Sequence, residues 1–205
     1  MRSRTAPALL ALALAGCPLP QPLPEYPAGQ TVTPPRIVVD DTVRQVAYPQ
    51  SFVEVPAGCA TAPLYALSVF LRDSSTEETV TGRWFVNYDA REQFSPTVVI
   101  QQQDTIPPPP AEAEDPFLRE SPTYVFAPYA NRPTAAGTGG GNGANVGAVH
   151  VVEYVVSNGF DPTAGSGAQD RPNRKPVRQG ELTFEVQVHR WVFVTVPPSA
   201  ATPCP

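Results

Sequence analysis

The sequence has few charged residues, few histidines and a single lysine. The shortage of charge and of lysine limits the partners that the protein could bind. Only 16% of the 205 residues are charged, and the formal net charge is −5. Lys175 is the only lysine and no Lys/Arg-rich run occurs. The chain therefore lacks the clustered positive charge that marks nucleic-acid-binding proteins, and we expect no nucleic acid as a partner.

Motifs of catalytic and metal sites are also missing. No GxSxG nucleophile elbow, HExxH pair or CxxC pair is present. Both histidines lie in runs that alternate as β-strands do. We expect His150 to share a packed face with Val152 and Tyr154, and His189 to lie with Gln187 on a more polar face. The sequence thus predicts no enzyme, no catalytic residue and no cofactor.

Long apolar runs are absent, and the one short run stands near the N-terminus. Residues 8–15 are apolar and follow Arg2 and Arg4. That length is far below the roughly 20 residues of a membrane-spanning helix, whereas a basic start followed by a short apolar run is typical of a signal peptide. No other stretch approaches spanning length, so we expect a protein anchored to a membrane and not through it.

The tetrad Leu-Ala-Gly-Cys at residues 14–17 ends this run. With its flanks it resembles the lipobox of bacterial lipoproteins. The resemblance implies cleavage of a signal peptide at 1–16 and a diacylglycerol thioether on Cys17, and two or three acyl chains hold a protein firmly to a bilayer. Pro18, in place of Asp, implies the outer membrane, facing the periplasm or the surface. An ordinary secretory signal with an accidental cysteine is the alternative.

A proline-rich segment follows and completes the region 17–35. Seven prolines between residues 18 and 35 favour extended polyproline II, with about 3.1 Å per residue. The segment is interpreted as a tether that spans on the order of 50 Å. A recognition segment for a proline-binding partner is the alternative.

From residue 36 the apolar residues alternate with period two, and turn residues separate the runs. We expect one all-β domain over 36–205, an antiparallel β-sandwich with long irregular loops at 104–122, 133–145 and 159–180. The expected strands are 37–39, 51–55, 64–73, 80–89, 97–103, 124–127, 149–157 and 182–196.

For the last of these strands, 182–196, the sequence does not decide which face points to the core. Val192, Val194 and Val196 fall in one register, which Arg190 interrupts. A bulge near Arg190 would turn Trp191 inward instead. A plain exposed arginine at a strand edge is the alternative.

Two local patterns sharpen the fold prediction. Residues 64–88 combine an apolar strand, an acidic turn and a strand that carries Trp84, and residues 150–160 form a strand that ends in Ser-Asn-Gly. Together they resemble immunoglobulin-like domains of the PKD and cadherin-like kind on bacterial surfaces. The resemblance implies an immunoglobulin-like sandwich in which Trp84 is the buried tryptophan of the third strand. The chain departs from antibody domains because no cysteine lies mid-strand beside Trp84.

The cysteine count predicts one disulfide. With Cys17 lipidated, Cys59 and Cys204 remain, and an even number in an oxidising compartment pairs. The bond closes a very long loop, for which chain entropy gives a stabilisation of about 5 kcal/mol as an upper figure.

The expected function is a lipid-anchored cell-envelope protein with a non-catalytic binding or structural role. Its partners would be the membrane, through the lipid, and another envelope protein that contacts loops or an edge strand. One alternative is a small envelope hydrolase that uses loop carboxylates such as Glu77 and Glu78. The other is a calcium-dependent adhesion module, since cadherin-like domains bind calcium through loop carboxylates, for which Asp73, Glu77, Glu78 and Asp161 are the candidates.

Overall fold

The computed structural model describes residues 35–39, 46–50, 52–88, 100–134, 143–160 and 186–205, and the backbone at 178–179 and 182–183. The chain divides into two compact units, Met1–Thr31 and Val32–Pro205, and every described residue belongs to the second. Among the described residues the elements are strands and one short 3₁₀ turn, η2 (Pro128–Ala130), so the predicted all-β fold is confirmed.

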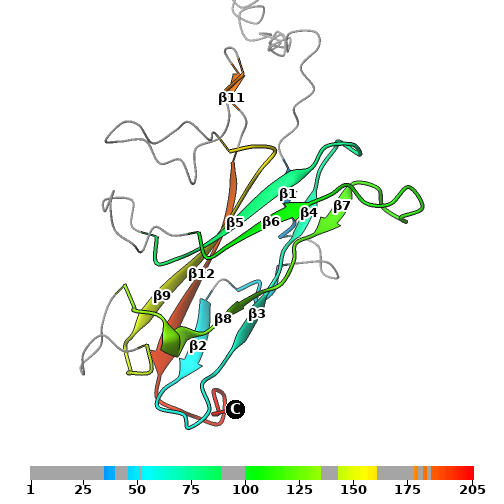
Figure 1. Ribbon diagram of the computed structural model, residues 1–205. Helices are drawn as coiled ribbons and strands as arrows, with labels where there is room; N and C mark the ends of the chain where they lie inside the picture. Colours follow the sequence, from blue (N-terminus) through cyan, green and yellow to red (C-terminus); the bar gives the residue numbers. More distant parts are fainter. Residues whose placement is uncertain are drawn as a thin grey trace, which may run out of the picture. The chain divides into compact units, whose positions relative to one another are not determined.

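The larger sheet has five strands, with the two longest near its middle (Figure 1). Their order is β2 (Phe52–Pro56), β12 (Gln187–Val196), β9 (Val149–Ser157), β5 (Val80–Val86) and β6 (Gln102–Ile106). All neighbours are antiparallel except β2 and β12, which run parallel. The sheet is therefore mixed, where the sequence predicts a wholly antiparallel one.

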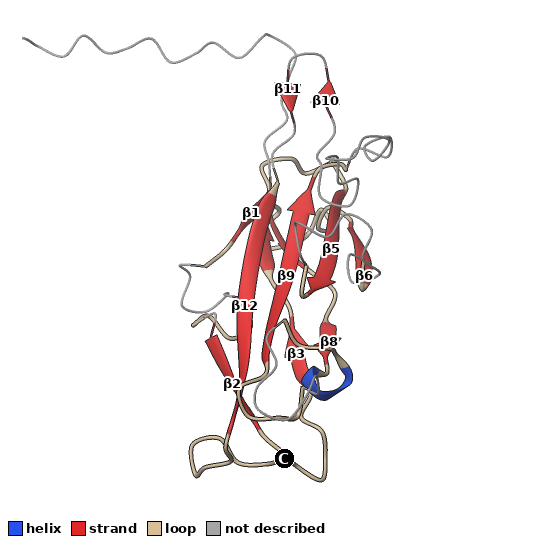
Figure 2. Cartoon of the chain, turned by 90° about the vertical axis from the view of Figure 1, so that its left-hand side faces the viewer, coloured by secondary structure: helices blue, strands red, loops and turns tan. Residues whose placement is uncertain are grey.

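A second layer packs against this sheet and consists of two short ladders (Figures 1 and 2). One ladder is β1 (Arg36–Ile37), β4 (Phe70–Arg72) and β7 (Leu118–Glu120), and the other is β3 (Tyr65–Leu67) and β8 (Tyr124–Phe126). The single strand expected at 64–73 is thus divided. Ser121 fills the break, because the Val69 amide donates to its Oγ over 3.0 Å and its own amide donates to the Val69 carbonyl over 2.9 Å.

Side chains from both layers meet around Trp84, which is fully buried as predicted. The Tyr124 ring of the second layer stacks on the Trp84 ring at a centroid distance of 5.0 Å. On the sheet side the rings of Tyr154 and Trp191 lie 4.5 and 5.7 Å away. Aromatic rings in such arrangements stabilise a core beyond the area that they bury.

The sixth strand differs from its prediction. A strand is expected over 97–103, of which residues 97–99 lie outside the described residues, and the structure has β6 at Gln102–Ile106; both β6 and β7 lie in or reach into the segment 104–122 that is predicted as a loop. The physical reason is a buried polar contact. Asp104 is buried because the Trp84 Nε1–H donates to its Oδ2 over 2.8 Å and the Gln102 Nε2–H to its Oδ1 over 2.8 Å. A strand whose inward residues are polar carries no apolar alternation.

The face of β12 is also opposite to the one favoured by its valines. Trp191 and Phe193 are buried, whereas Val192 and Val194 are only partly so. The pairing with β9 runs without a slip from Gln187↔Val156 to Val194↔Val149, so the bulge expected near Arg190 is absent. Both faces of the strand are apolar, and the larger aromatic rings occupy the core side.

Arg190 lies on the outer face of β12, half-exposed, and its Nε donates to the buried Glu153 carboxylate over 2.7 Å. At Arg190 the described part of β12 pairs with β9, and its pairing with β2 begins only at Val192.

Gly82 on β5 makes room for the Tyr154 ring. A Cβ atom at Gly82 would lie 1.9 Å from the Tyr154 hydroxyl oxygen. That hydroxyl is buried without a hydrogen-bond partner among the described residues, and burial together with the charge of Asp104 raises its pKa. Burial of the unpaired Tyr154 hydroxyl thus costs desolvation energy. Its position leaves no room for a side chain at Gly82.

We predict that Gly82→Ala destabilises the fold by about 1–3 kcal/mol or more through overpacking, and that Tyr154→Phe is near neutral or stabilising because the lost hydroxyl is unpaired. In the double variant Tyr154→Phe should recover part of the loss, as measured by urea denaturation. Gly58→Ala is the control, since it meets nothing within 4 Å and carries only the cost of its positive φ, about 1–2 kcal/mol. Strict additivity of the two changes would contradict this account.

Candidate functional site

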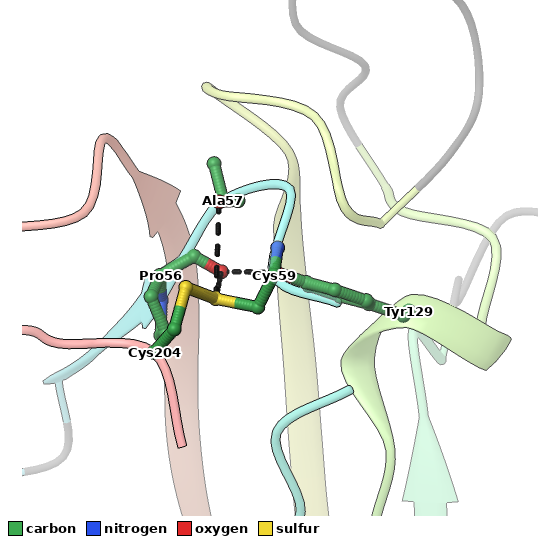
Figure 3. The surroundings of a disulfide bond; sticks show 5 residues. All are labelled: Pro56, Ala57, Cys59, Tyr129 and Cys204. Atoms are coloured by element: carbon green, nitrogen blue, oxygen red, sulfur yellow. Dashed lines mark hydrogen bonds between the residues drawn. A yellow bond between two sulfur atoms is a disulfide. The ribbon is translucent and has the colours of Figure 1, made fainter. Parts of the chain in front are cut away.

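The predicted disulfide between Cys59 and Cys204 is confirmed (Figure 3). It joins the loop after β2 to the end of the chain, with the two Cα atoms 5.5 Å apart and 145 residues of sequence between them. This Cα distance is typical of disulfides. The bond therefore fixes the segment that leaves β12 against the loop that leaves β2.

Tyr129 of η2 braces the same loop from the other side (Figure 3). Its hydroxyl donates to the Pro56 carbonyl and accepts the Cys59 amide over 3.2 Å. Gly58, with φ +62°, turns the loop so that its amide donates to the Ala144 carbonyl over 3.2 Å. One side chain and one left-handed residue thus hold Cys59 in place.

The end of the chain has a second attachment. The Thr202 hydroxyl donates to Glu54 Oε2 over 2.7 Å, and Thr202 is buried. Ser199 and Thr202 also exchange backbone hydrogen bonds of 3.1 and 3.2 Å. The segment after β12 is therefore held at Thr202 as well as at Cys204.

We predict that Cys59→Ser combined with Cys204→Ser lowers the free energy of unfolding by up to about 5 kcal/mol, because the open chain regains the entropy of a 145-residue loop. Guanidinium denaturation of this variant and of the wild type, with and without reductant, measures the loss. The variant itself is the control for reductant, which should leave it unchanged. An unfolding midpoint of the wild type that is insensitive to reductant would contradict the prediction.

The candidate calcium ligands do not share one arrangement. Asp73 is buried against Arg119, with its Oδ2 3.1 Å from the guanidinium Nη2. Glu78 accepts the Asn158 Nδ2–H over 2.7 Å, Glu77 is exposed in the turn, and Asp161 lies outside the described residues. Within the described part of the chain, no group of three or more His, Cys, Asp or Glu side chains could hold a metal ion.

At the β4–β5 turn the Arg119 guanidinium lies where a bound cation would be expected. Its guanidinium donates to the backbone carbonyls of Ser75 and Glu78, each over 2.6 Å, and to that of Ile106 over 3.3 Å. One buried side chain of β7 thereby ties the β4–β5 turn to the end of β6. The Asp73 carboxylate and the carbonyls that would suit calcium thus face an arginine of the chain itself.

Both histidines lie on the core side of the sheet. His150 is fully buried with Val152 and Tyr154, as predicted, and its Nδ1 lies 3.1 Å from Asn87 Nδ2. His189 was expected on the polar face. Instead it packs edge-on against Trp191 at 4.4 Å, because the face of β12 is reversed. Burial lowers the pKa of His189, and it lowers the pKa of His150 to about 4.

We predict that the protein loses stability as the pH falls from 6.5 to 4. His150 binds a proton near pH 6.5 when unfolded but only near pH 4 when folded, so the unfolded state takes up more protons across this range. Each pKa unit corresponds to about 1.4 kcal/mol, which gives a loss of about 3 kcal/mol from His150. Urea denaturation between pH 4 and 7 measures the slope, and His150→Gln should reduce it. An equal slope in the variant would contradict this assignment.

Several predictions made from the sequence lie wholly outside the described residues: the signal peptide 1–16, Cys17, the tether through residue 34 and Asp161. The predicted loops 133–145 and 159–180 lie partly outside them. Among the residues that are described, no helix is long and apolar enough to span a membrane. Comparison with known proteins finds no matching family model, no matching curated protein and no matching solved structure.

Sequence reasoning missed the residues that organise both ends of the domain. Arg119, Asp104 and Tyr129 each act through a contact that is distant in sequence, such as the 73-residue separation of Tyr129 and Pro56. The only local sign of such a distant contact would be a charged residue that interrupts the apolar alternation of a strand. Asp104 and Arg119 stand in segments without that alternation.

Proposed function

We propose that this protein is a bacterial lipoprotein of the cell envelope, anchored in the outer membrane through Cys17, which presents an immunoglobulin-like domain for binding without catalysis. The observation that carries the proposal is the Leu-Ala-Gly-Cys tetrad at 14–17, placed directly after a basic start and a short apolar run. The proline-rich segment that follows would act as the tether.

The cysteine pairing supports an envelope location. The chain has three cysteines, and Cys59 and Cys204 are bonded to each other. Disulfides persist in oxidising compartments such as the periplasm and the cell surface, so the bond favours a protein exported from the cytoplasm. Cys17 is then the odd cysteine, and acylation gives it a chemical role.

The strand order supports the immunoglobulin-like proposal. In such domains the third strand carries a buried tryptophan and lies beside the sixth strand, which lies beside the seventh. Here β5 carries the buried Trp84 and is followed across the sheet by β9 and then β12. Two short ladders, β1–β4–β7 and β3–β8, cover the opposite face, where that architecture has its second sheet.

Binding through an edge strand is the mode that the second layer favours. Within the described ladders β8 pairs with β3 alone, and Val125 on β8 is 54% exposed. An extended segment of another envelope protein could add to such an edge through backbone hydrogen bonds. Reproducible in-cell crosslinks from this domain to one envelope protein would support binding, and their absence at saturating crosslinker would count against it.

We predict that the wild type incorporates a fatty-acid label and fractionates with the outer membrane, whereas Cys17→Ala takes up no label and leaves that fraction, because the thioether has no other attachment point. The matched control is the variant with serine at both Cys59 and Cys204, which should keep the label. If neither wild type nor Cys17→Ala is labelled and both fractionate alike, the lipoprotein proposal fails.

A further inference from the structure

The connection between β6 and β7 carries four consecutive prolines, residues 107–110, which we call the proline run. In Figure 1 this connection is the green loop that extends beyond both strands, well away from the C-terminus. The run belongs to the segment predicted as an irregular loop, and the edge contact proposed for β8 does not involve it.

The proline run is confined to an extended conformation. Each proline fixes its own φ, and a residue that precedes proline is kept out of the helical region, which applies to Ile106 and to the first three prolines. Among the described residues no hydrogen bond reaches the carbonyls at 107–109. Backbone with these properties is polyproline II, a helix with three residues per turn whose carbonyls stay open to a partner.

The exposure of the four rings follows this period of three residues. Pro107 and Pro110 are exposed, whereas Pro108 and Pro109 are half-buried. Positions i and i+3 of polyproline II lie on the same side of the helix, about 9 Å apart, so the two exposed rings form one ridge. Prolines at this spacing are what aromatic-lined grooves of peptide-binding domains recognise.

The domain fixes both ends of the proline run. Ile106, directly before it, is buried and pairs with Val80, and its carbonyl accepts the Arg119 Nη1–H over 3.3 Å. At the other end the Pro110 carbonyl accepts the Ala113 amide over 2.9 Å. A segment that is already held in one conformation loses little entropy when it binds, which favours its use as a ligand.

The charge of the chain after the run indicates the rim of the partner's groove. Residues 111–117 contain three acidic side chains, Glu112, Glu114 and Asp115, and no basic one. Glu112 and Glu114 are exposed, whereas Asp115 is half-buried and pairs with Arg72 over 3.0 Å. The exposed carboxylates favour a groove with Arg or Lys at its rim. They disfavour nucleic acids and anionic lipid headgroups, which are themselves negative.

We propose that the proline run is a docking ligand for a partner protein that has an aromatic-lined groove with a basic rim. Aromatic rings of the groove would pack on Pro107 and Pro110, and donors beside them would bond to the open carbonyls. The contact goes beyond the edge-strand binding proposed for β8, because it uses proline rings and carbonyls of a different loop. It does not rest on the lipid anchor.

A photo-crosslinking residue at Ala111, which is exposed next to the run, tests the proposal in permeabilised cells that make the full chain naturally. We expect one predominant protein adduct, and excess poly-L-proline should abolish it because this polymer presents the same helix. Pro107→Ala combined with Pro110→Ala should lower the adduct yield about tenfold or more, which corresponds to about 1.4 kcal/mol of binding. The matched control is Pro197→Ala with Pro198→Ala, two exposed prolines after β12, and it should leave the yield unchanged.

Charge provides a second readout. Glu112→Gln combined with Glu114→Gln should lower the yield, and so should raising NaCl from about 0.05 to about 0.5 M, because salt screens the attraction to a basic rim. Thermal melting shows that each variant is folded.

Three outcomes would overturn the proposal: no adduct at saturating light, an adduct that survives the double alanine variant, or an adduct that survives excess poly-L-proline. An adduct that neither salt nor the glutamine variant weakens overturns the basic rim. A crosslinker at Val125 reports the edge of β8 in the same cells, and the fatty-acid label reports the anchor. The failure of either of those proposals is therefore seen separately from the failure of this one.

Discussion

The packing around Trp84 is the constraint on which the rest of the domain depends. Tyr124 comes from the second layer, and Tyr154 and Trp191 come from the large sheet, so this one contact region holds the two layers together. No cysteine lies mid-strand to bridge the layers, and aromatic area takes that role. The indole N–H then requires an acceptor inside the core, which Asp104 supplies. The polar sequence of β6 is a direct consequence.

The two ends of the domain are held by different interactions. At one end a buried guanidinium, that of Arg119, forms an ion pair with the Asp73 carboxylate and donates to three carbonyls of separate segments. Such an ion pair is costly to desolvate, and its value lies in fixing which segments meet. At the other end the loops meet through a covalent bond, a tyrosine hydroxyl, backbone hydrogen bonds and one hydrogen bond from Thr202 to the Glu54 carboxylate. An ion pair thus fixes the loops at one end, and a disulfide fixes them at the other.

The pattern of apolar residues along the sequence predicted those strands whose residues follow that pattern. β9 spans Val149–Ser157 as expected, because it is rich in β-branched valines, which favour strands. The disulfide was predictable from the cysteine count once Cys17 was assigned to the lipid anchor. The displaced β6 and the reversed face of β12 were not, since one has polar residues facing the core and the other is apolar on both faces. The contacts of Arg119 and Tyr129 span 41 and 73 residues, and no local pattern encodes them.

The disulfide also bears on the chemical state of Cys17. Of three cysteines, Cys59 and Cys204 are bonded to each other, which leaves Cys17 as the odd one. In the oxidising compartment that the proposal implies, an odd cysteine forms intermolecular disulfides or stays a reactive thiol unless its sulfur is blocked. A thioether would block it permanently, and it could not exchange with Cys59 or Cys204. The pairing of Cys59 with Cys204 thus agrees with the proposed acylation of Cys17, through thiol chemistry and independently of the residues that surround Cys17.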